Sequence, residues 1–280
     1  MRMRSLLLVT LAVISASSVG AQTAPAASVQ LYTLDCGKLD FPDMSDLSDT
    51  GENAGKAGTL AVPCYLIHHG KDWMLWDTGL GDKIAAKPNG EMVNGARFSV
   101  RRTLVSQLAE LGLKPDSIHY VALSHLHLDH CGNIDLFPHA IFLVPGVELA
   151  WARATTGAPG LVPALIAPLA HDSIDTSNYD RDVFGDGTVK ILVAPGHTPG
   201  HRILLVKLAK SGSILISGDL YHTRENYEKG LVPSWNYSRA ETLASFNRFA
   251  GIQKNTHARV IVEHAPEDFA AMPAFPKFLD

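Results

Sequence analysis

Five short apolar runs, each followed by an aspartate or a histidine, restrict the fold more than any other feature of the chain. The runs are residues 73–76, 120–123, 190–193, 213–216 and 259–262. Apolar runs of this length without polar alternation are typical of strands that are buried on both faces. In layered α/β folds, sites form where strand ends open into loops. We therefore expect one site that gathers the residues after these runs: Asp77, His125, His197, Asp219 and His264.

Helical patterns lie between the predicted strands. Residues 98–111 carry a stripe of leucines that stops before Gly112, which predicts a helix ending there. Ser238 and Glu241 have the spacing of a capping box, and an apolar stripe follows them. Residues 151–175 are rich in Ala and Pro and predict short helices over one face. Strands that alternate with helices predict an α/β fold.

The segment SHLHLDHCGN, residues 124–133, places His125, His127, Asp129 and His130 within six positions. The chain has 13 histidines in 280 residues, so this crowding is unusual. Packing these side chains together without a cation leaves several buried polar groups with few partners. Neutral imidazoles and carboxylates are good ligands for zinc and related divalent metals. The segment therefore predicts metal binding.

Four ligands from six residues rarely serve one tetrahedral ion, so two ions are the more natural arrangement. His197, Asp219 and His264 are the candidates to complete them, because each follows a predicted buried strand. Asp219 suits the position between the ions, where a carboxylate can bridge. Two metals about 3.5–4 Å apart can hold a hydroxide, polarise a carbonyl oxygen and take the leaving oxygen of a hydrolysed bond.

The ordered set of histidines and aspartates, with Asp77-Thr78-Gly79 before it, resembles the metallo-β-lactamase superfamily. The resemblance implies an α/β fold of the αββα four-layer sandwich type. It also implies two Zn2+ ions per chain, with Fe, Mn or Co as substitutes. One ion is implied on His125, His127 and His197 and the other on Asp129, His130 and His264, with Asp219 bridging them. Asp77 is implied to fix the ligand loop without being a ligand.

Residues 61–67, 218–227 and 264–269 are most similar to the N-acyl-homoserine lactonases, the quorum-quenching lactonases. This implies a dinuclear metal-dependent hydrolase that opens the lactone ring, with Asp129 giving a proton to the leaving oxygen. One position departs from the family, which commonly has a tyrosine three residues after the bridging aspartate. His222 stands there, beside Tyr221. Either side chain could donate a hydrogen bond to the substrate, or His222 is a plain surface residue.

Two other functions stay open at this stage. A β-lactamase or a general carboxylic-ester hydrolase of the same fold is the alternative enzyme, although true β-lactamases usually have cysteine or serine where Asp219 stands. A metal-dependent binding protein without turnover is the alternative outside enzymes. An acyl chain needs an apolar groove, and we expect it near Met44, Trp151 and residues 161–169.

Residues 1–21 have a basic start, a short apolar run and small residues, the order of a secretory signal peptide. We expect cleavage after residue 21, a single hydrolase domain over residues 22–280, and a periplasmic or secreted protein with no membrane contact after cleavage. A net charge of −4 without a basic block argues against nucleic acid as a partner.

The expected partner is a small-molecule lactone, and by the same resemblance the chain can form a homodimer. The chain has 3 cysteines, an odd number that allows one disulfide and one thiol in an exported protein. Whether Cys36 and Cys64 pair stays open at this stage.

Overall fold

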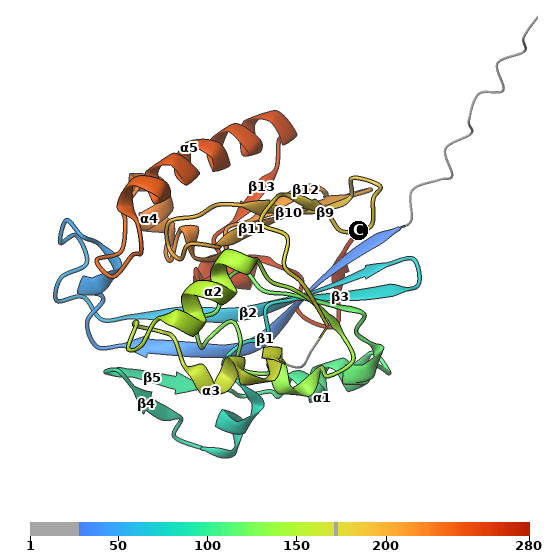
Figure 1. Ribbon diagram of the computed structural model, residues 1–280, viewed down its shortest axis with the longest axis horizontal. Coiled ribbons are helices and arrows are strands. Elements are labelled where there is room, and N and C mark those ends of the chain that lie inside the picture. Colours follow the sequence, from blue (N-terminus) through green and yellow to red (C-terminus); the bar gives the residue numbers. More distant parts are fainter. Residues whose placement is uncertain (1–27, 171–172) are drawn as a thin grey trace, which may run out of the picture.

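Two β-sheets packed face to face form the centre of the protein (Figure 1). The computed structural model describes residues 28–170 and 173–280, so the predicted signal peptide at residues 1–21 lies outside the described residues. The first sheet has nine strands, in the order β4 (Glu91–Val93), β5 (Ala96–Ser99), β1 (Val29–Phe41), β2 (Gly58–His69), β3 (Asp72–Trp76), β6 (Tyr120–Ala122), β7 (Ile141–Leu143) and β8 (Ser173–Asp175), with β14 (Phe278–Leu279) paired to β1. The second has five, in the order β13 (Arg259–Ile261), β12 (Gly212–Ile216), β11 (Arg202–Leu208), β10 (Val189–Val193) and β9 (Arg181–Asp182).

Helices cover the outer face of each sheet. Side chains of α1 (Leu104–Glu110), α2 (Gly146–Ala154) and α3 (Pro163–Ile166) join one apolar cluster with the first sheet. Side chains of α4 (Arg224–Lys229) and α5 (Arg239–Thr256) join another with the second sheet, and Figure 1 shows α5 lying over that sheet. A third cluster, which includes Trp76, Ile191 and Ile216, fills the space between the sheets. The predicted αββα sandwich is therefore confirmed.

All five predicted apolar runs form strands, namely β3, β6, β10, β12 and β13. Two neighbouring pairs among them are parallel: β3 with β6 in the first sheet, and β12 with β13 in the second. Parallel neighbours have their carboxyl ends at the same sheet edge, where loops can form a site. The arrangement brings the loop after β3 beside the loop after β6, and the loop after β12 beside the loop after β13.

The predicted helix over residues 98–111 is shorter than expected. Residues 96–99 form β5, which pairs with β1, and α1 begins only at Leu104. Thr103 caps that helix by accepting a hydrogen bond from the backbone N–H of Ser106 at 3.2 Å. The predicted start of α5 is confirmed, since the Ser238 hydroxyl accepts from the N–H of Glu241 at 3.3 Å. Backbone pairing to β1 outweighed the helical periodicity before residue 103.

Two of the three cysteines form a disulfide and the third is a free thiol, as their odd number allows. Cys36 of β1 and Cys64 of β2 form a disulfide with a Cα–Cα distance of 5.7 Å, and Cys131 is free and buried.

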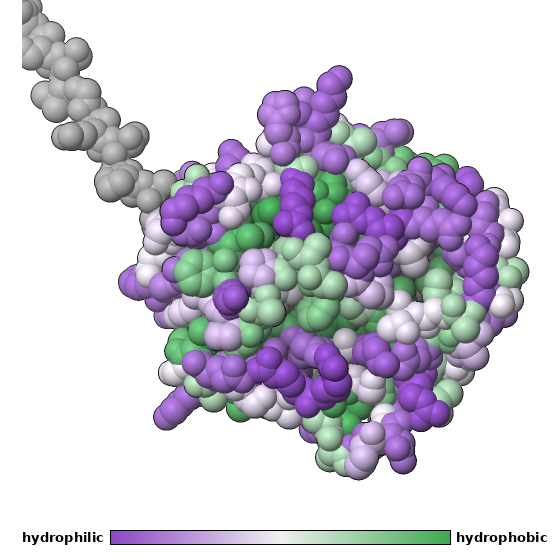
Figure 2. Space-filling model, turned by 180° about the vertical axis from the view of Figure 1, so that it is seen from behind, coloured by the Kyte–Doolittle hydropathy of each residue, from purple (hydrophilic) through white to green (hydrophobic). Residues whose placement is uncertain are grey.

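Hydrophilic side chains cover much of the face seen in Figure 2, with apolar areas between them. Among the described residues, no helix is both long and apolar enough to cross a membrane.

Candidate metal centre

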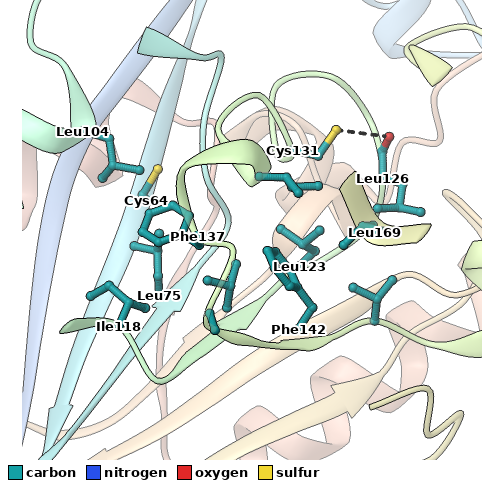
Figure 3. Close-up of a cluster of buried hydrophobic side chains, with 14 of the residues drawn as sticks. Cys64, Leu75, Leu104, Ile118, Leu123, Leu126, Cys131, Phe137, Phe142 and Leu169 are labelled. Carbon is teal, nitrogen blue, oxygen red and sulfur yellow. Dashed lines mark hydrogen bonds between the residues drawn. The ribbon is translucent and has the colours of Figure 1, made fainter. Parts of the chain in front are cut away.

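The turn after β6 alternates between the site and the core. His125 and His127 face the site, whereas Leu126 between them is buried in the apolar cluster under the first sheet. Cys131 closes the turn from the same cluster, and its Sγ lies 3.6 Å from the carbonyl oxygen of Leu126, to which it donates (Figure 3). The apolar members of the turn therefore anchor it to the core, and the polar members are left to converge above it.

Three ring nitrogens meet in a first cluster. His197 Nε2 lies 3.1 Å from His125 Nε2 and 3.0 Å from His127 Nδ1. The Oδ2 atom of Asp219 lies 3.3 Å from His197 Nε2 and 3.6 Å from His125 Nε2. Donors bound to one tetrahedral zinc ion, at about 2.0–2.1 Å from it, are about 3.3 Å apart. The four side chains thus have the mutual spacing of a single coordination shell.

A second cluster lies on the other side of Asp219. Its Oδ1 atom lies 2.9 Å from His264 Nε2 and 3.1 Å from His130 Nε2, and these two nitrogens are 3.2 Å apart. Asp129 Oδ2 completes this cluster at 3.6 Å from His264 Nε2 and 3.7 Å from His130 Nε2. The two oxygens of Asp219 therefore face different clusters, which is the geometry of a bridging carboxylate.

Both clusters fit divalent metal ions by the chemistry of their donors. All the histidines and Asp219 are buried, and within the described part of the chain Asp219 Oδ1 has no hydrogen-bond donor of suitable geometry. Leaving converging nitrogen lone pairs and a carboxylate oxygen unpaired in the interior is costly. A divalent cation satisfies all of them at once, and imidazole with carboxylate suits zinc as well as iron, manganese and cobalt.

The outer nitrogens of the second cluster have partners that fix the ring tautomers. His264 Nδ1 donates to the carbonyl oxygen of Ala61 at 2.6 Å, and His130 Nδ1 donates to Asp77 Oδ2 at 2.8 Å. Nε2 is therefore the nitrogen of each ring that faces the centre. Burial opposes protonation of both rings, but Asp219 foremost raises their pKa values, so a bound cation would take the place of a proton on Nε2. Asp77 also accepts from the N–H of Ser124 at 2.6 Å, and its φ of 57° turns the carboxylate toward the ligand turn. The structure thus places Asp77 against the ligand turn and outside both ligand clusters.

Burial keeps the first cluster in the form that binds metal. Burial lowers the pKa of His127 to about 4 and lowers the pKa values of His125 and His197 well below the ordinary value. Burial opposes ionisation of Asp219 as well, but the surrounding histidines, with His264 foremost, hold its pKa well below its usual range. Three neutral imidazoles facing an ionised carboxylate form a ready set of ligands.

A cavity of about 390 Å³ opens over both clusters. Asp129, Asp219, His222 and His264 form its polar end. Its remaining wall is mainly apolar and comes from the end of β1, the loop after it, β2, the hairpin of β4 and β5, and the segment near residue 160; the apolar members include Leu39, Phe41, Met44, Leu60, Val93, Ala96, Phe98 and Trp235. A polar reaction site at the floor of an apolar pocket is the usual form of a small-molecule site.

Three sequence predictions for this cavity have different outcomes. Met44 lines it as expected. Trp151 is not among the lining residues, although its ring centroid lies 6.2 Å from that of His127. The prediction for residues 161–169 was wrong, because Leu161, Ile166 and Leu169 are buried in the core under the first sheet. Their apolar character serves helix packing rather than the pocket.

Of the two candidate residues that follow Asp219, Tyr221 and His222, only His222 lines the cavity. His222 Nε2 lies 3.2 Å from Asp219 Oδ2. Tyr221 lies outside the cavity lining and stacks on Phe246 of α5, with ring centroids 4.4 Å apart. Adjacent residues of an extended segment point to opposite sides, so Tyr221 packs into the helical layer while His222 faces the site.

His201 is a site residue that the sequence did not single out. Its Nδ1 donates to the carbonyl oxygen of Ala194, and its Nε2 accepts from the N–H of Asp219, both at 2.9 Å. His201 therefore ties the backbone of the bridging carboxylate to the loop that carries His197. Its place four residues after His197 was the only available signal.

Comparison with known proteins identifies a family and named relatives. The model of the metallo-beta-lactamase superfamily matches residues 57–264. The chain is 30% identical to the N-acyl homoserine lactonase AttM of Azorhizobium caulinodans over 269 residues, which cover 90% of this chain and 99% of the relative. It is 29% identical to the N-acyl homoserine lactonase AiiA of Bacillus thuringiensis subsp. kurstaki over 231 residues, covering 80% of this chain and 89% of that one.

Solved structures agree with these relatives. An N-acyl homoserine lactone hydrolase with the product N-hexanoyl-L-homoserine bound at its catalytic metal centre has a TM-score of 0.78 at 25% identity. The match covers 91% of this chain and 100% of that chain. A second structure, of a quorum-quenching N-acyl homoserine lactone hydrolase, has a TM-score of 0.76 at 26% identity.

Proposed function

The chain belongs to the metallo-beta-lactamase superfamily, and we propose that within it the protein is an N-acyl homoserine lactonase, a hydrolase that opens the lactone ring of acylated homoserine lactones. One observation carries the proposal. Asp219 lies between two histidine clusters at the floor of a cavity whose wall is mainly apolar. This pairs a hydrolytic centre with a pocket for an acyl chain, and the relatives that share almost the whole chain are named for the same reaction.

Different side chains have different roles in ring opening. The apolar wall receives the acyl chain and excludes water from it, which leaves the lactone ring at the polar end of the cavity. When bound, two divalent ions supply an acidified water as nucleophile and positive charge that polarises the ester carbonyl. His222 faces the same space and can donate a hydrogen bond to the substrate oxygen. The Asp129 carboxylate borders the cavity and can take up the proton that the attacking water releases and pass it to the alkoxide oxygen that leaves the ester.

The finer features of the proposal concern the metal and the compartment. We propose two ions per chain, zinc by preference, held by His125, His127 and His197 on one side and by Asp129, His130 and His264 on the other, with Asp219 shared. We also propose export to the periplasm or medium through residues 1–21. The Cys36–Cys64 disulfide supports export, because such bonds persist in oxidising compartments.

Ring opening of N-hexanoyl-L-homoserine lactone tests the function. The metal-loaded protein should convert the lactone to the open acid, and Asp219→Asn should reduce kcat by roughly a thousandfold or more, because the bridging charge contributes several kcal/mol. A cephalosporin assayed in parallel distinguishes a β-lactamase. Turnover of the lactam without turnover of the lactone would contradict the proposal.

A further inference from the structure

Glu148 of α2 connects two loops that are far apart in sequence. Its side chain is fully buried, with 0% of its surface exposed. One carboxylate oxygen accepts from the N–H of Leu126 at 3.0 Å, and the other accepts from the N–H of Gly200 at 2.8 Å. A single carboxylate is therefore the common acceptor for both loops.

Both loops carry donors of the first cluster. Leu126 lies between His125 and His127, and Gly200 follows His197 by three residues. We propose that Glu148 is a positioning residue that sets the spacing of these three ring nitrogens and so controls the metal affinity of the first cluster. The proposal rests on the metal centre proposed above, but not on the identity of the substrate.

The chemistry of the contact requires a carboxylate. Two N–H groups approach Glu148 from different loops, and each needs an acceptor in the protein interior. A glutamine offers one acceptor oxygen, and its NH2 group would face the second N–H donor. Glu148→Gln thus keeps the size of the side chain and removes one of the two connections.

Helix α2 also packs closely against the loop that carries Gly200. A Cβ atom on Gly200 would lie 2.5 Å from the Cβ atom of Glu148 and 3.0 Å from its backbone nitrogen. No larger residue fits at position 200 unless the loop or the helix moves. Gly200→Ala therefore displaces the same loop from the opposite direction and leaves the carboxylate intact.

Two ligands of the second cluster have hydrogen-bond partners other than Glu148. His130 is held by Asp77, and His264 is held by the carbonyl oxygen of Ala61. The hydrogen bonds that the Glu148 carboxylate accepts from the described backbone come from Leu126 and Gly200, and neither residue neighbours Asp129, His130 or His264 directly in sequence. Loss of the carboxylate should consequently affect one ion much more than the other.

Competition with a chelator, read by native mass spectrometry of the zinc-loaded protein, tests the inference without any turnover. Glu148→Gln should lower the affinity for one ion by about 10- to 100-fold, the usual effect of removing a partner that orients metal ligands. Anomalous diffraction from the singly loaded variant should place the retained ion on Asp129, His130 and His264. Gly200→Ala should give the same pattern.

Gln107→Glu is the matched control. Gln107 is also fully buried and also joins a helix to distant backbone, accepting from the N–H of Asp35 and donating to its carbonyl. This variant should lose folding stability and keep both ions equally. Equal weakening of both ions in Glu148→Gln, or unchanged binding of both, would overturn the role of Glu148. Failure of the unaltered protein to bind zinc would overturn the proposed metal centre as well.

Discussion

His222 is a buried imidazole at the cavity floor that belongs to neither donor cluster. Only 2% of its surface is exposed, and among the described residues neither of its ring nitrogens has a hydrogen-bond partner of suitable geometry, although Nε2 lies 3.2 Å from Asp219 Oδ2. Such a group is costly to bury unless something else satisfies it. Because His222 lines the cavity beside Asp219, a bound substrate is the expected partner.

Replacing His222 tests that expectation. His222→Phe should lower kcat on N-hexanoyl-L-homoserine lactone by roughly 10- to 100-fold, the effect of losing one hydrogen bond to a developing charge. His222→Tyr restores a donor and should recover part of the loss. Steady-state kinetics with metal content measured on each variant make the comparison. Full activity in His222→Phe with both metals bound would show that the side chain does not contact the reacting ester.

Local spacing explains which site residues the sequence could predict. His125, His127, Asp129 and His130 occupy one turn, and the other candidate ligands follow buried strands, so their meeting point is set by the fold class. Glu148 and His201 had no comparable signal. Each acts by touching the backbone of a loop distant in sequence, and such a contact is visible only after the helix and the loops have packed.

At the scale of elements, two neighbouring residues of strand β4 face opposite sides, one toward the cavity and the other toward solvent. Val93 lines the cavity, whereas its neighbour Met92 is 58% exposed. Alternate residues of a strand face opposite sides, so the two positions form a matched pair. A larger side chain should fill the pocket at the first position and only extend into water at the second.

The pair predicts a change in substrate preference. In the unaltered protein, kcat/KM should rise by about fourfold for each methylene added to the acyl chain, since burying one methylene contributes about 0.8 kcal/mol. Val93→Trp should flatten this dependence for long chains and leave N-butanoyl-L-homoserine lactone almost unaffected. Met92→Trp should behave like the unaltered protein. An unchanged preference in Val93→Trp would place the acyl chain elsewhere.

Strands that are buried on both faces could be predicted from their continuous apolar runs, and other elements could be predicted less well. The runs that became β3, β6, β10, β12 and β13 stand out because both faces of each strand are packed. The hairpin of β4 and β5 has mixed polarity and carries no such mark. It forms through pairing with β1, a contact between distant residues, and so both this part of the cavity wall and the true start of α1 were missed.

At the scale of the whole molecule, buried neutral histidines make the metal-free protein sensitive to acid. Burial lowers the pKa values of His127 and His201 to about 4, against 6.5 for an exposed histidine. Unfolded chains therefore bind protons that the folded protein cannot bind between these two values. The contribution of His127 and His201 to the folding free energy is at its full value above about pH 6.5 and is lost as the pH falls toward 4. His130 and His264 contribute in the opposite direction, because Asp219 raises their pKa values against the effect of burial.

Urea unfolding of the metal-free protein at several pH values measures this loss. Each of the two histidines should contribute up to about 3 kcal/mol to the decrease in unfolding free energy across that interval. His201→Gln, which cannot titrate, should show a shallower pH dependence. An identical pH dependence of the unfolding free energy in His201→Gln and in the unaltered protein would contradict the prediction.

The Cys36–Cys64 disulfide links the stability of the whole molecule to the compartment in which it folds. The bond closes a loop with a sequence separation of 28. Constraining a loop of that size in the unfolded chain contributes about 3–4 kcal/mol. Cys36 also supports the site, because its carbonyl oxygen accepts from the N–H of Leu80 in the loop that begins at Asp77. Reduction of the disulfide should therefore lower the folding stability and also loosen the loop that begins at Asp77, which contacts the ligand turn.

Comparing the chain produced with and without residues 1–21 in a bacterium tests the disulfide and the proposed export together. With the segment, the protein should be recovered outside the cytoplasm with the bond formed. Without it, the cysteines should be reduced and the midpoint of urea unfolding should fall to that of Cys36→Ala/Cys64→Ala. The double variant should not respond to added thiol, whereas the oxidised protein should lose about 3–4 kcal/mol. Recovery of the full chain in the cytoplasm with both cysteines reduced would contradict export, and equal stability of the oxidised and reduced forms would contradict the role of the bond.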